Sequence, residues 1–192
     1  MSARPDLYDA VLDRAAAHAR AWLSDVPTRV VPPKSTCDDI VEALGGELPD
    51  GPTDPAEVID LLAERIEPLD ADVVVAVESR GFIFGAPAAA ALGLGFAPVR
   101  KPGKLPHKTL RRTYDLEYGT DSLEMHADAV GPGLRAVIVD DLLATGGTAA
   151  ATVELVREQG ARVVGAFFVV ELTLLPGRAR LPGVPVDALL SY

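Results

Sequence analysis

Short unbroken runs of apolar residues alternate with amphipathic stretches through residues 72–170. The runs span residues 72–77, 96–99, 136–139 and 162–170. Continuous apolar runs of this length are typical of strands that are buried on both faces of a parallel sheet. Helical patterns lie between them at residues 82–92 and 148–159, and each is followed by a glycine that can end a helix, Gly93 or Gly160. Strands that alternate with helices predict an α/β domain whose parallel sheet is covered by helices on both faces.

A different pattern separates the second and third of these runs. Residues 100–112 contain six Lys or Arg and no acidic residue, which predicts a basic loop. Residues 113–118 and 122–126 then lie on either side of Gly119, and the second of these segments alternates apolar and polar positions. A period of two beside a glycine predicts a β-hairpin.

The N-terminal part of the chain is predicted to be helical. Residues 5–24 form an alanine-rich amphipathic stretch, and residues 38–44 form a shorter one that ends before two glycines. A third helix is predicted to begin at Asp54, because an aspartate can cap a helix and the proline that follows suits the first turn. We therefore expect a helical segment over residues 1–70, which is not an independent domain, followed by the sheet domain over residues 71–192.

The composition is that of an ordinary globular protein, with 192 residues, 48% of them hydrophobic and 24% charged. The net charge of −10 argues against a nucleic-acid partner, because phosphate backbones attract an excess of Lys and Arg. Residues 81–99 carry no charge, but their four glycines and two prolines favour a buried strand-helix-strand passage over a membrane span. The chain begins without the apolar segment of a signal peptide, and the single Cys37 cannot form an internal disulfide. A cytoplasmic location is expected.

The strongest chemical signal is the passage from Val137 to Thr148. A buried strand leads into two adjacent carboxylates, Asp140 and Asp141, and then into a loop of small residues before a helix. The loop consists of Ala144, Thr145, Gly146, Gly147 and Thr148. The backbone N–H groups of such a loop can close around a phosphate, and the helix N-terminus adds about half a positive charge. The carboxylates would repel phosphate but suit a sugar diol, so a ribose 5-phosphate fits both groups.

The spacing excludes two common nucleotide-binding loops. The GxxxxGK[ST] spacing of a P-loop is absent, and no GxGxxG follows a strand. An ordinary strand-to-helix turn is the alternative interpretation, but adjacent acids before Ala-Thr-Gly-Gly-Thr favour ligand binding. The same acids can hold a Mg²⁺ ion through water when it lies beside a pyrophosphate.

This passage resembles the signature of type I phosphoribosyltransferases, and further segments are similar to the adenine phosphoribosyltransferase family. Those segments are residues 78–85, 99–106, 114–119, 123–124 and 170–185. The resemblance implies a type I phosphoribosyltransferase-like parallel sheet flanked by helices, with a small hood made by the chain ends and an extra helical N-terminal segment. It also implies transfer of phosphoribose from phosphoribosyl pyrophosphate to adenine, giving AMP and pyrophosphate, by a homodimer that uses Mg²⁺.

The resemblance also assigns roles residue by residue. The loop over residues 144–148 would bind the 5-phosphate, and Asp140 and Asp141 would face the ribose hydroxyls. Glu117 would be the general acid/base that handles the proton of the adenine nitrogen. Pyrophosphate binding falls to Ser79, Arg80, Lys101 and Lys104, and base binding to Arg80 and Leu172.

The N-terminal region departs from this family pattern. Family members carry Phe-Pro-x-Pro-Gly followed by Phe-Arg-Asp, which form one wall of the base pocket, whereas the first phenylalanine here is Phe82. Residues 15–62 instead resemble the N-terminal arm of pyridoxal-phosphate-dependent group II decarboxylases, a helical dimerisation element. Three alternatives therefore stay open: a phosphoribosyltransferase for another purine base, a non-catalytic protein that binds phosphoribosyl pyrophosphate or a nucleotide, and an inactive chimera.

Overall fold

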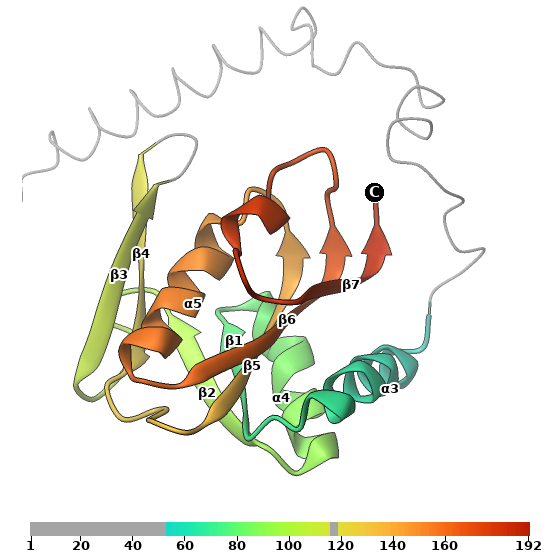
Figure 1. The fold of residues 1–192 in the computed structure, drawn as a ribbon, viewed down its shortest axis with the longest axis horizontal. Coiled ribbons are helices and arrows are strands. Elements are labelled where there is room, and N and C mark those ends of the chain that lie inside the picture. Colours follow the sequence, from blue (N-terminus) through green and yellow to red (C-terminus); the bar gives the residue numbers. More distant parts are fainter. Residues whose placement is uncertain (1–52, 116–118) are drawn as a thin grey trace, which may run out of the picture. The chain divides into compact units, whose positions relative to one another are not determined.

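The computed structural model describes residues 53–115 and 119–192 (Figure 1). All of these residues belong to one compact unit, Gly45–Tyr192. Within this part of the chain, a seven-stranded sheet runs in the order β3-β4-β2-β1-β5-β6-β7. The helices predicted at residues 5–24 and 38–44 lie outside the described residues. Among the helices that are described, none has the length and apolar character needed to cross a membrane.

The sheet combines a parallel centre with an antiparallel hairpin at one edge. Its strands are β1 (Val73–Val77), β2 (Gly95–Arg100), β3 (Thr109–Asp115), β4 (Thr120–His126), β5 (Arg135–Leu143), β6 (Arg162–Glu171) and β7 (Val186–Ser191). β1 pairs in parallel with β2 on one side and with β5 on the other, and β6 and β7 continue the parallel order. β4 pairs antiparallel with both β2 and β3, which confirms the predicted hairpin.

Helices cover both faces of this sheet (Figure 1). They are α3 (Pro55–Ile66), α4 (Arg80–Leu92) and α5 (Gly147–Glu158), with short 3-10 helices η2 (Glu67–Leu69) and η3 (Arg178–Arg180). α3 begins as the sequence predicts, because the Asp54 side chain accepts a hydrogen bond from the Ala56 N–H at 2.8 Å. α4 ends at Gly93, whose φ of 67° is a left-handed conformation that glycine adopts readily. α3 belongs to the predicted segment 1–70, yet it packs into the core of the sheet.

Side chains of the central strands point alternately into two hydrophobic cores. Val74 and Val137 pack with Leu62 of α3 and with alanines of α4 on one face, while Val75 and Ile138 pack with α5 on the other. All five of these side chains are completely buried. Burying a side chain of this size stabilises a fold by about 1.5 to 3 kcal/mol, so the ends of β1 and β5 are held firmly in place. The predicted α/β class, with a sheet flanked by helices, is confirmed.

The structure corrects the predicted strands at three places: two boundaries and one additional strand. β5 continues through the two aspartates to Leu143, although the sequence pattern placed them after the strand, because β6 pairs with β5 over this length. β3 begins at Thr109, inside the predicted basic loop, because β4 pairs with it from there. β7 was not predicted at all. It is an edge strand in which no residue is fully buried, so no buried apolar run marks it in the sequence.

Candidate active site

A cavity of 430 Å³ opens at the carboxyl ends of β1 and β5. The chain crosses from β1 to β2 on one side of β1, while β5 lies on its other side, and such a reversal is where open parallel sheets bind ligands. The cavity is lined by Val77, Glu78, Ser79, Arg80, Lys101 and residues 140–149. The fold therefore brings together the predicted phosphate loop, the acid pair and three of the four predicted pyrophosphate contacts.

The loop over residues 144–148 connects β5 to α5 without a bulky side chain. Gly146 is the N-cap of α5, with a φ of 79° and a ψ of 3°, a conformation that costs other residues about 1 to 2 kcal/mol. No side chain caps this helix, so the N–H groups of its first turn have no partner within the helix. Gly147, Thr148 and Ala149 of that turn line the cavity. Free amide donors at the positive end of a helix suit a phosphate.

The two aspartates at the end of β5 lie in different environments. Asp140 accepts a hydrogen bond from the backbone N–H of Asp141 at 2.9 Å, and burial raises the pKa of Asp140 to about 7. Asp141 instead forms an ion pair with Arg80, whose Nε donates to its Oδ2. A Cβ at Gly81 would lie 2.7 Å from Asp140 Oδ1. The missing side chain at Gly81 therefore lets α4 begin directly against the acid pair.

Both cations that line the cavity are paired with carboxylates. The Arg80 side chain, which is 70% exposed, is held by Asp141, and the Lys101 Nζ lies 3.1 Å from Asp121 Oδ2 on β4. Each carboxylate raises the pKa of its partner by accepting a hydrogen bond from it. Exposed ion pairs of this kind contribute little to stability, because water screens both charges. A more highly charged anion in the cavity can therefore replace Asp141 and Asp121 as the ion-pair partners of the two cations.

Three polar residues near the cavity were missed in the sequence. Glu78 lines the cavity and forms an ion pair with Arg100 at 2.7 Å. Tyr114 accepts a hydrogen bond from Thr148 Oγ1 at 3.2 Å and donates a long one to Asp121 Oδ2 at 3.5 Å. The signal for Glu78 was its place directly after a buried strand. Tyr114 and Asp121 face each other through the register of the hairpin, which the sequence pattern does not fix.

Two predicted site residues do not line this cavity, and a third lies outside the described residues. Lys104 is exposed, and its carbonyl oxygen accepts a hydrogen bond from Arg100 Nη1 at 3.0 Å. Leu172 is half-buried, and its N–H donates to the carbonyl oxygen of Leu143 at 2.9 Å, which ties it to the start of the phosphate loop. Glu117 is the residue outside the described part. The roles assigned to these three residues stay predictions.

The acid pair fits a magnesium ion whose other ligands come from the substrate. In residues 53–115 and 119–192, no group of three or more His, Cys, Asp or Glu is placed to hold a metal. Proteins commonly hold Mg²⁺ with one or two carboxylates, while water and substrate phosphates supply the other ligands. Asp140 and Asp141 offer such a pair beside the loop that suits a phosphate. The residues present therefore fit an ion that arrives with a phosphorylated ligand.

Comparison with known proteins identifies a phosphoribosyl transferase domain over residues 46–174. The adenine phosphoribosyltransferase of Clostridium perfringens is 58% identical over 134 residues, which cover 70% of this chain and 78% of that protein. The crystal structure of adenine phosphoribosyltransferase from Thermoanaerobacter pseudethanolicus superposes with a TM-score of 0.71 and 46% identity, covering 80% of this chain and 98% of that one.

A further solved structure carries ligands. Adenine phosphoribosyltransferase from Saccharomyces cerevisiae, in complex with D-2,5-dideoxy-2,5-imino-altritol 1,6-bisphosphate and adenine, has a TM-score of 0.68 and 44% identity. The match covers 71% of this chain and 79% of that one. These comparisons agree with the fold. The decarboxylase-like resemblance of residues 15–62 stays a prediction.

Proposed function

This chain belongs to the adenine phosphoribosyltransferase family, and we propose that the cavity at the carboxyl ends of β1 and β5 is its active site. The enzyme transfers phosphoribose from phosphoribosyl pyrophosphate to adenine, which gives AMP and pyrophosphate in purine salvage. The main support for the proposal is that one cavity is lined by a loop of small residues, an acid pair and two cations. A donor with a phosphate at one end, a diol in the middle and a pyrophosphate nearby requires this combination.

We assign the parts of the donor to the parts of the cavity. The loop over residues 144–148 binds the 5-phosphate through its free N–H groups, which the geometry of the α5 N-terminus supports. Asp140 and Asp141 accept hydrogen bonds from the ribose hydroxyls. The pyrophosphate is bound by Ser79, Arg80, Lys101 and Lys104. Binding requires Arg80 and Lys101 to exchange their carboxylate partners for phosphate oxygens, which their exposed positions allow.

The reaction breaks the bond between C1 of the ribose and the pyrophosphate and forms a bond from C1 to N9 of adenine. Positive charge develops on the sugar between these events, and carboxylates close to it stabilise that charge. We assign Glu117 as the general base that takes the proton from the adenine nitrogen. Magnesium, when bound with the donor, neutralises negative charge on the departing pyrophosphate. The family motif supports the role of Glu117, which belongs to the segment that the structure does not describe.

Finer properties of the enzyme are also proposals. Leu172 and Arg80 contact the adenine, which the tie between Leu172 and the phosphate loop supports. We expect a homodimer with residues 98–104 near its contact and a cytoplasmic location. Residues 1–70 are proposed as a segment that does not fold alone. Sedimentation of the purified chain measures its oligomeric state.

A panel of bases tests the function. The purified chain is incubated with labelled phosphoribosyl pyrophosphate, magnesium and one base at a time, namely adenine, hypoxanthine or xanthine. We expect pyrophosphate release that depends on adenine and yields AMP. Release with another base alone would assign a different purine, and donor binding without release with any base would leave a non-catalytic binder.

The role of Glu117 is tested separately. Glu117→Leu removes the carboxylate, and Glu117→Gln keeps its shape without its basicity. We expect both variants to lower turnover by about a hundredfold or more while donor affinity changes little. Turnover that is equal to that of the unmodified enzyme would remove the acid/base role from this residue.

A further inference from the structure

Residues 172–185, called the outer loop below, connect β6 to β7 and contact the phosphate loop from outside the cavity through a second glycine, Gly177. A Cβ at Gly177 would lie 2.5 Å from the carbonyl oxygen of Ala144 and 2.8 Å from Cγ of Leu143. A Cβ at Gly146 would in turn lie 2.6 Å from the carbonyl oxygen of Gly177. Real Cβ atoms do not approach other atoms this closely, so the two backbones meet without room for a side chain on either. Gly177 itself is buried and does not line the cavity.

Space, and not backbone conformation, explains why position 177 is a glycine. Gly177 has a φ of −54° and a ψ of −50°, which every L-residue adopts without strain. An alanine there would meet no conformational penalty. Its methyl group would instead press on the carbonyl group of Ala144 and on the Leu143 side chain, which is buried. Packed interiors do not absorb such a group freely, so either the phosphate loop or the outer loop must shift.

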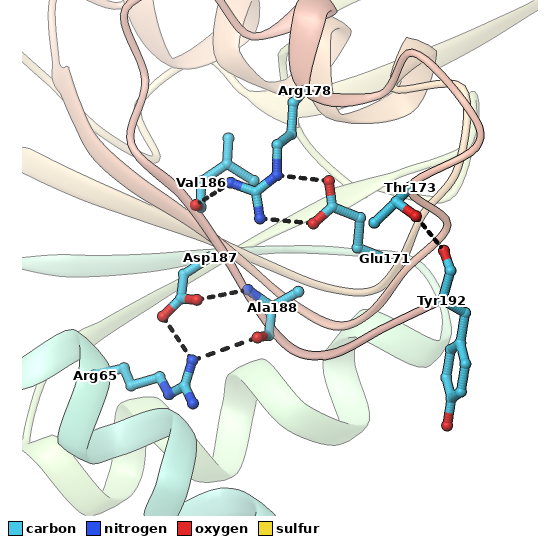
Figure 2. Close-up of polar contacts among 8 residues, drawn as sticks. All are labelled: Arg65, Glu171, Thr173, Arg178, Val186, Asp187, Ala188 and Tyr192. Atoms are coloured by element: carbon cyan, nitrogen blue, oxygen red, sulfur yellow. Dashed lines mark hydrogen bonds and ion pairs between the residues drawn. The ribbon is translucent and has the colours of Figure 1, made fainter. Parts of the chain in front are cut away.

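The outer loop is anchored on both sides of Gly177, which limits how far it can yield. Arg178 forms two hydrogen bonds with Glu171, from Nε and from Nη2, each 2.6 Å long, and Nη1 donates to the carbonyl oxygen of Val186 at 2.6 Å (Figure 2). Glu171 is buried and sits at the end of β6. On the other side, the N–H of Leu172 donates to the carbonyl oxygen of Leu143 at 2.9 Å. A bidentate pair with a buried carboxylate fixes both position and orientation.

We propose that Gly177 is a positioning residue that sets the shape of the phosphate loop, held in place by the Arg178–Glu171 pair. Gly177, 33 positions after Ala144 in the sequence, thus supports the loop end of the cavity from behind. This inference rests on the proposed binding of the 5-phosphate by residues 144–148. Gly177 touches no substrate, so it acts only through the positions of the amide groups on the loop.

Gly177→Ala tests the proposal, with AMP and adenosine as probes. The two ligands differ only in the 5′-phosphate, so the ratio of their dissociation constants measures how much that phosphate contributes to binding. We expect Gly177→Ala to weaken AMP binding by about tenfold or more, while adenosine binding changes less than about twofold. Titration calorimetry or competition measures both affinities. Gly131→Ala is the matched control, because a Cβ there meets no atom within 4 Å and its φ is not left-handed.

Each outcome bears on one claim. Unmodified enzyme that binds AMP no better than adenosine would refute the phosphate role of the loop itself. A normal ratio in the unmodified enzyme that persists in Gly177→Ala would refute the positioning role alone. Equal weakening of both ligands would also refute it, because the change would then not be confined to the contacts with the phosphate.

Arg178→Lys provides a second variant in case Gly177→Ala does not fold. Lysine keeps the charge but cannot make the bidentate pair with Glu171, so the anchor loosens while its charge remains. We expect AMP binding to weaken by about threefold and adenosine binding to stay unchanged. An AMP affinity equal to that of the unmodified enzyme would show that the pair does not hold the loop in its binding shape.

Discussion

The two ends of the cavity are built in different ways. The loop end consists of backbone N–H groups and small residues, and its geometry is set by the packing of Gly146 against Gly177. The other end, which we propose binds the pyrophosphate and call the pyrophosphate end, consists of Arg80 and Lys101, two largely exposed side chains that are each paired with a carboxylate. A site made of packed backbone can bind a ligand without rearrangement, whereas paired side chains must first exchange partners.

This difference suggests different tasks for the two ends: the loop end positions the ligand, and the cations of the other end interact with its charge. If the loop end binds the 5-phosphate as proposed, it fixes where the ribose ring lies, because its amide donors have few alternative positions. The pyrophosphate end can follow a group that leaves, because its cations move between carboxylate and phosphate partners at little cost in free energy. The loss of affinity after a substitution at the loop end should therefore depend on the volume of the added side chain. The loss after a substitution at the pyrophosphate end should depend on the charge removed and on the salt concentration.

The largest expected effect comes from adding volume at the loop end. Gly146→Ala places a side chain on a residue with a φ of 79° and within 2.6 Å of the carbonyl oxygen of Gly177. We expect affinity for phosphoribosyl pyrophosphate to fall by about a hundredfold, since conformational strain and overpacking act together. Titration with the donor measures this loss.

Gly133→Ala separates strain from contact. Gly133 has a φ of 89°, similar to that of Gly146, but a Cβ there would meet no atom within 4 Å. We expect this control to lose about 1 to 2 kcal/mol of stability and to keep its donor affinity. Donor affinities that agree between the two alanine variants would contradict the claim that packing sets the loop.

The acid pair lines the same cavity as the two ends, and its pH dependence gives the next effect. Burial raises the pKa of Asp140 from 3.8 to about 7 in the folded enzyme. Between these two values the folded state binds a proton that the unfolded state has released. The free energy of unfolding therefore falls as pH rises through this window, and the stabilisation is complete only below it.

Asp140→Asn should remove that pH dependence. The free energy of unfolding of the unmodified enzyme, relative to the variant, should fall by about 3 kcal/mol between pH values of about 4 and about 7. Urea unfolding at several pH values in this range measures both curves. Parallel curves would show that the folded state does not raise the pKa of Asp140.

Removing one charge at the pyrophosphate end should have a smaller and more selective effect. Lys101→Ala should weaken binding of phosphoribosyl pyrophosphate by about tenfold, the usual scale of one charge-assisted contact. AMP has no pyrophosphate, so its affinity should change by less than about twofold. Lys108→Ala is the control, because Lys108 is exposed and does not line the cavity. Equal losses for both ligands would mean that the two ends are not independent.

The loop end could be predicted from the sequence because all its parts are local. The strand, the acid pair, the small residues and the helix start follow one another between Val137 and Thr148, and each has its own physical signature. The central sheet was predictable for a similar reason, since burial on both faces leaves unbroken apolar runs. Among the central parallel strands, the end of β5 was misplaced, because pairing with β6 carries the strand through two charged residues.

The support of this site could not be predicted, because it depends on contacts between distant segments. Arg80 and Asp141 are 61 positions apart, and only the fold shows that they form an ion pair. Gly177 carries no local signal, since its backbone is in an ordinary helical conformation and its importance lies in what surrounds it. The antiparallel pairing that brings Asp121 near Lys101 depends on a hairpin register that alternation alone leaves open.

The smallest expected effect tests whether one side chain joins the two ends. The hydroxyl of Tyr114 accepts a hydrogen bond from Thr148 in the phosphate loop and donates a long one to Asp121, the partner of Lys101. Burial raises the pKa of Tyr114, so the hydroxyl keeps the proton that it donates.

Tyr114→Phe removes both bonds but keeps the ring. We expect affinity for phosphoribosyl pyrophosphate to fall by about threefold, because two neutral or weak hydrogen bonds together are worth about 0.5 to 1 kcal/mol. AMP affinity should fall by a similar factor, since the bond to Thr148 serves the phosphate that both ligands share. Tyr192→Phe, at a residue that does not line the cavity, is the control. If donor and AMP affinities both match the control, Tyr114 does not couple the loop to the cations. If only the donor affinity falls, Tyr114 acts through Asp121 and Lys101 alone and not through the phosphate loop.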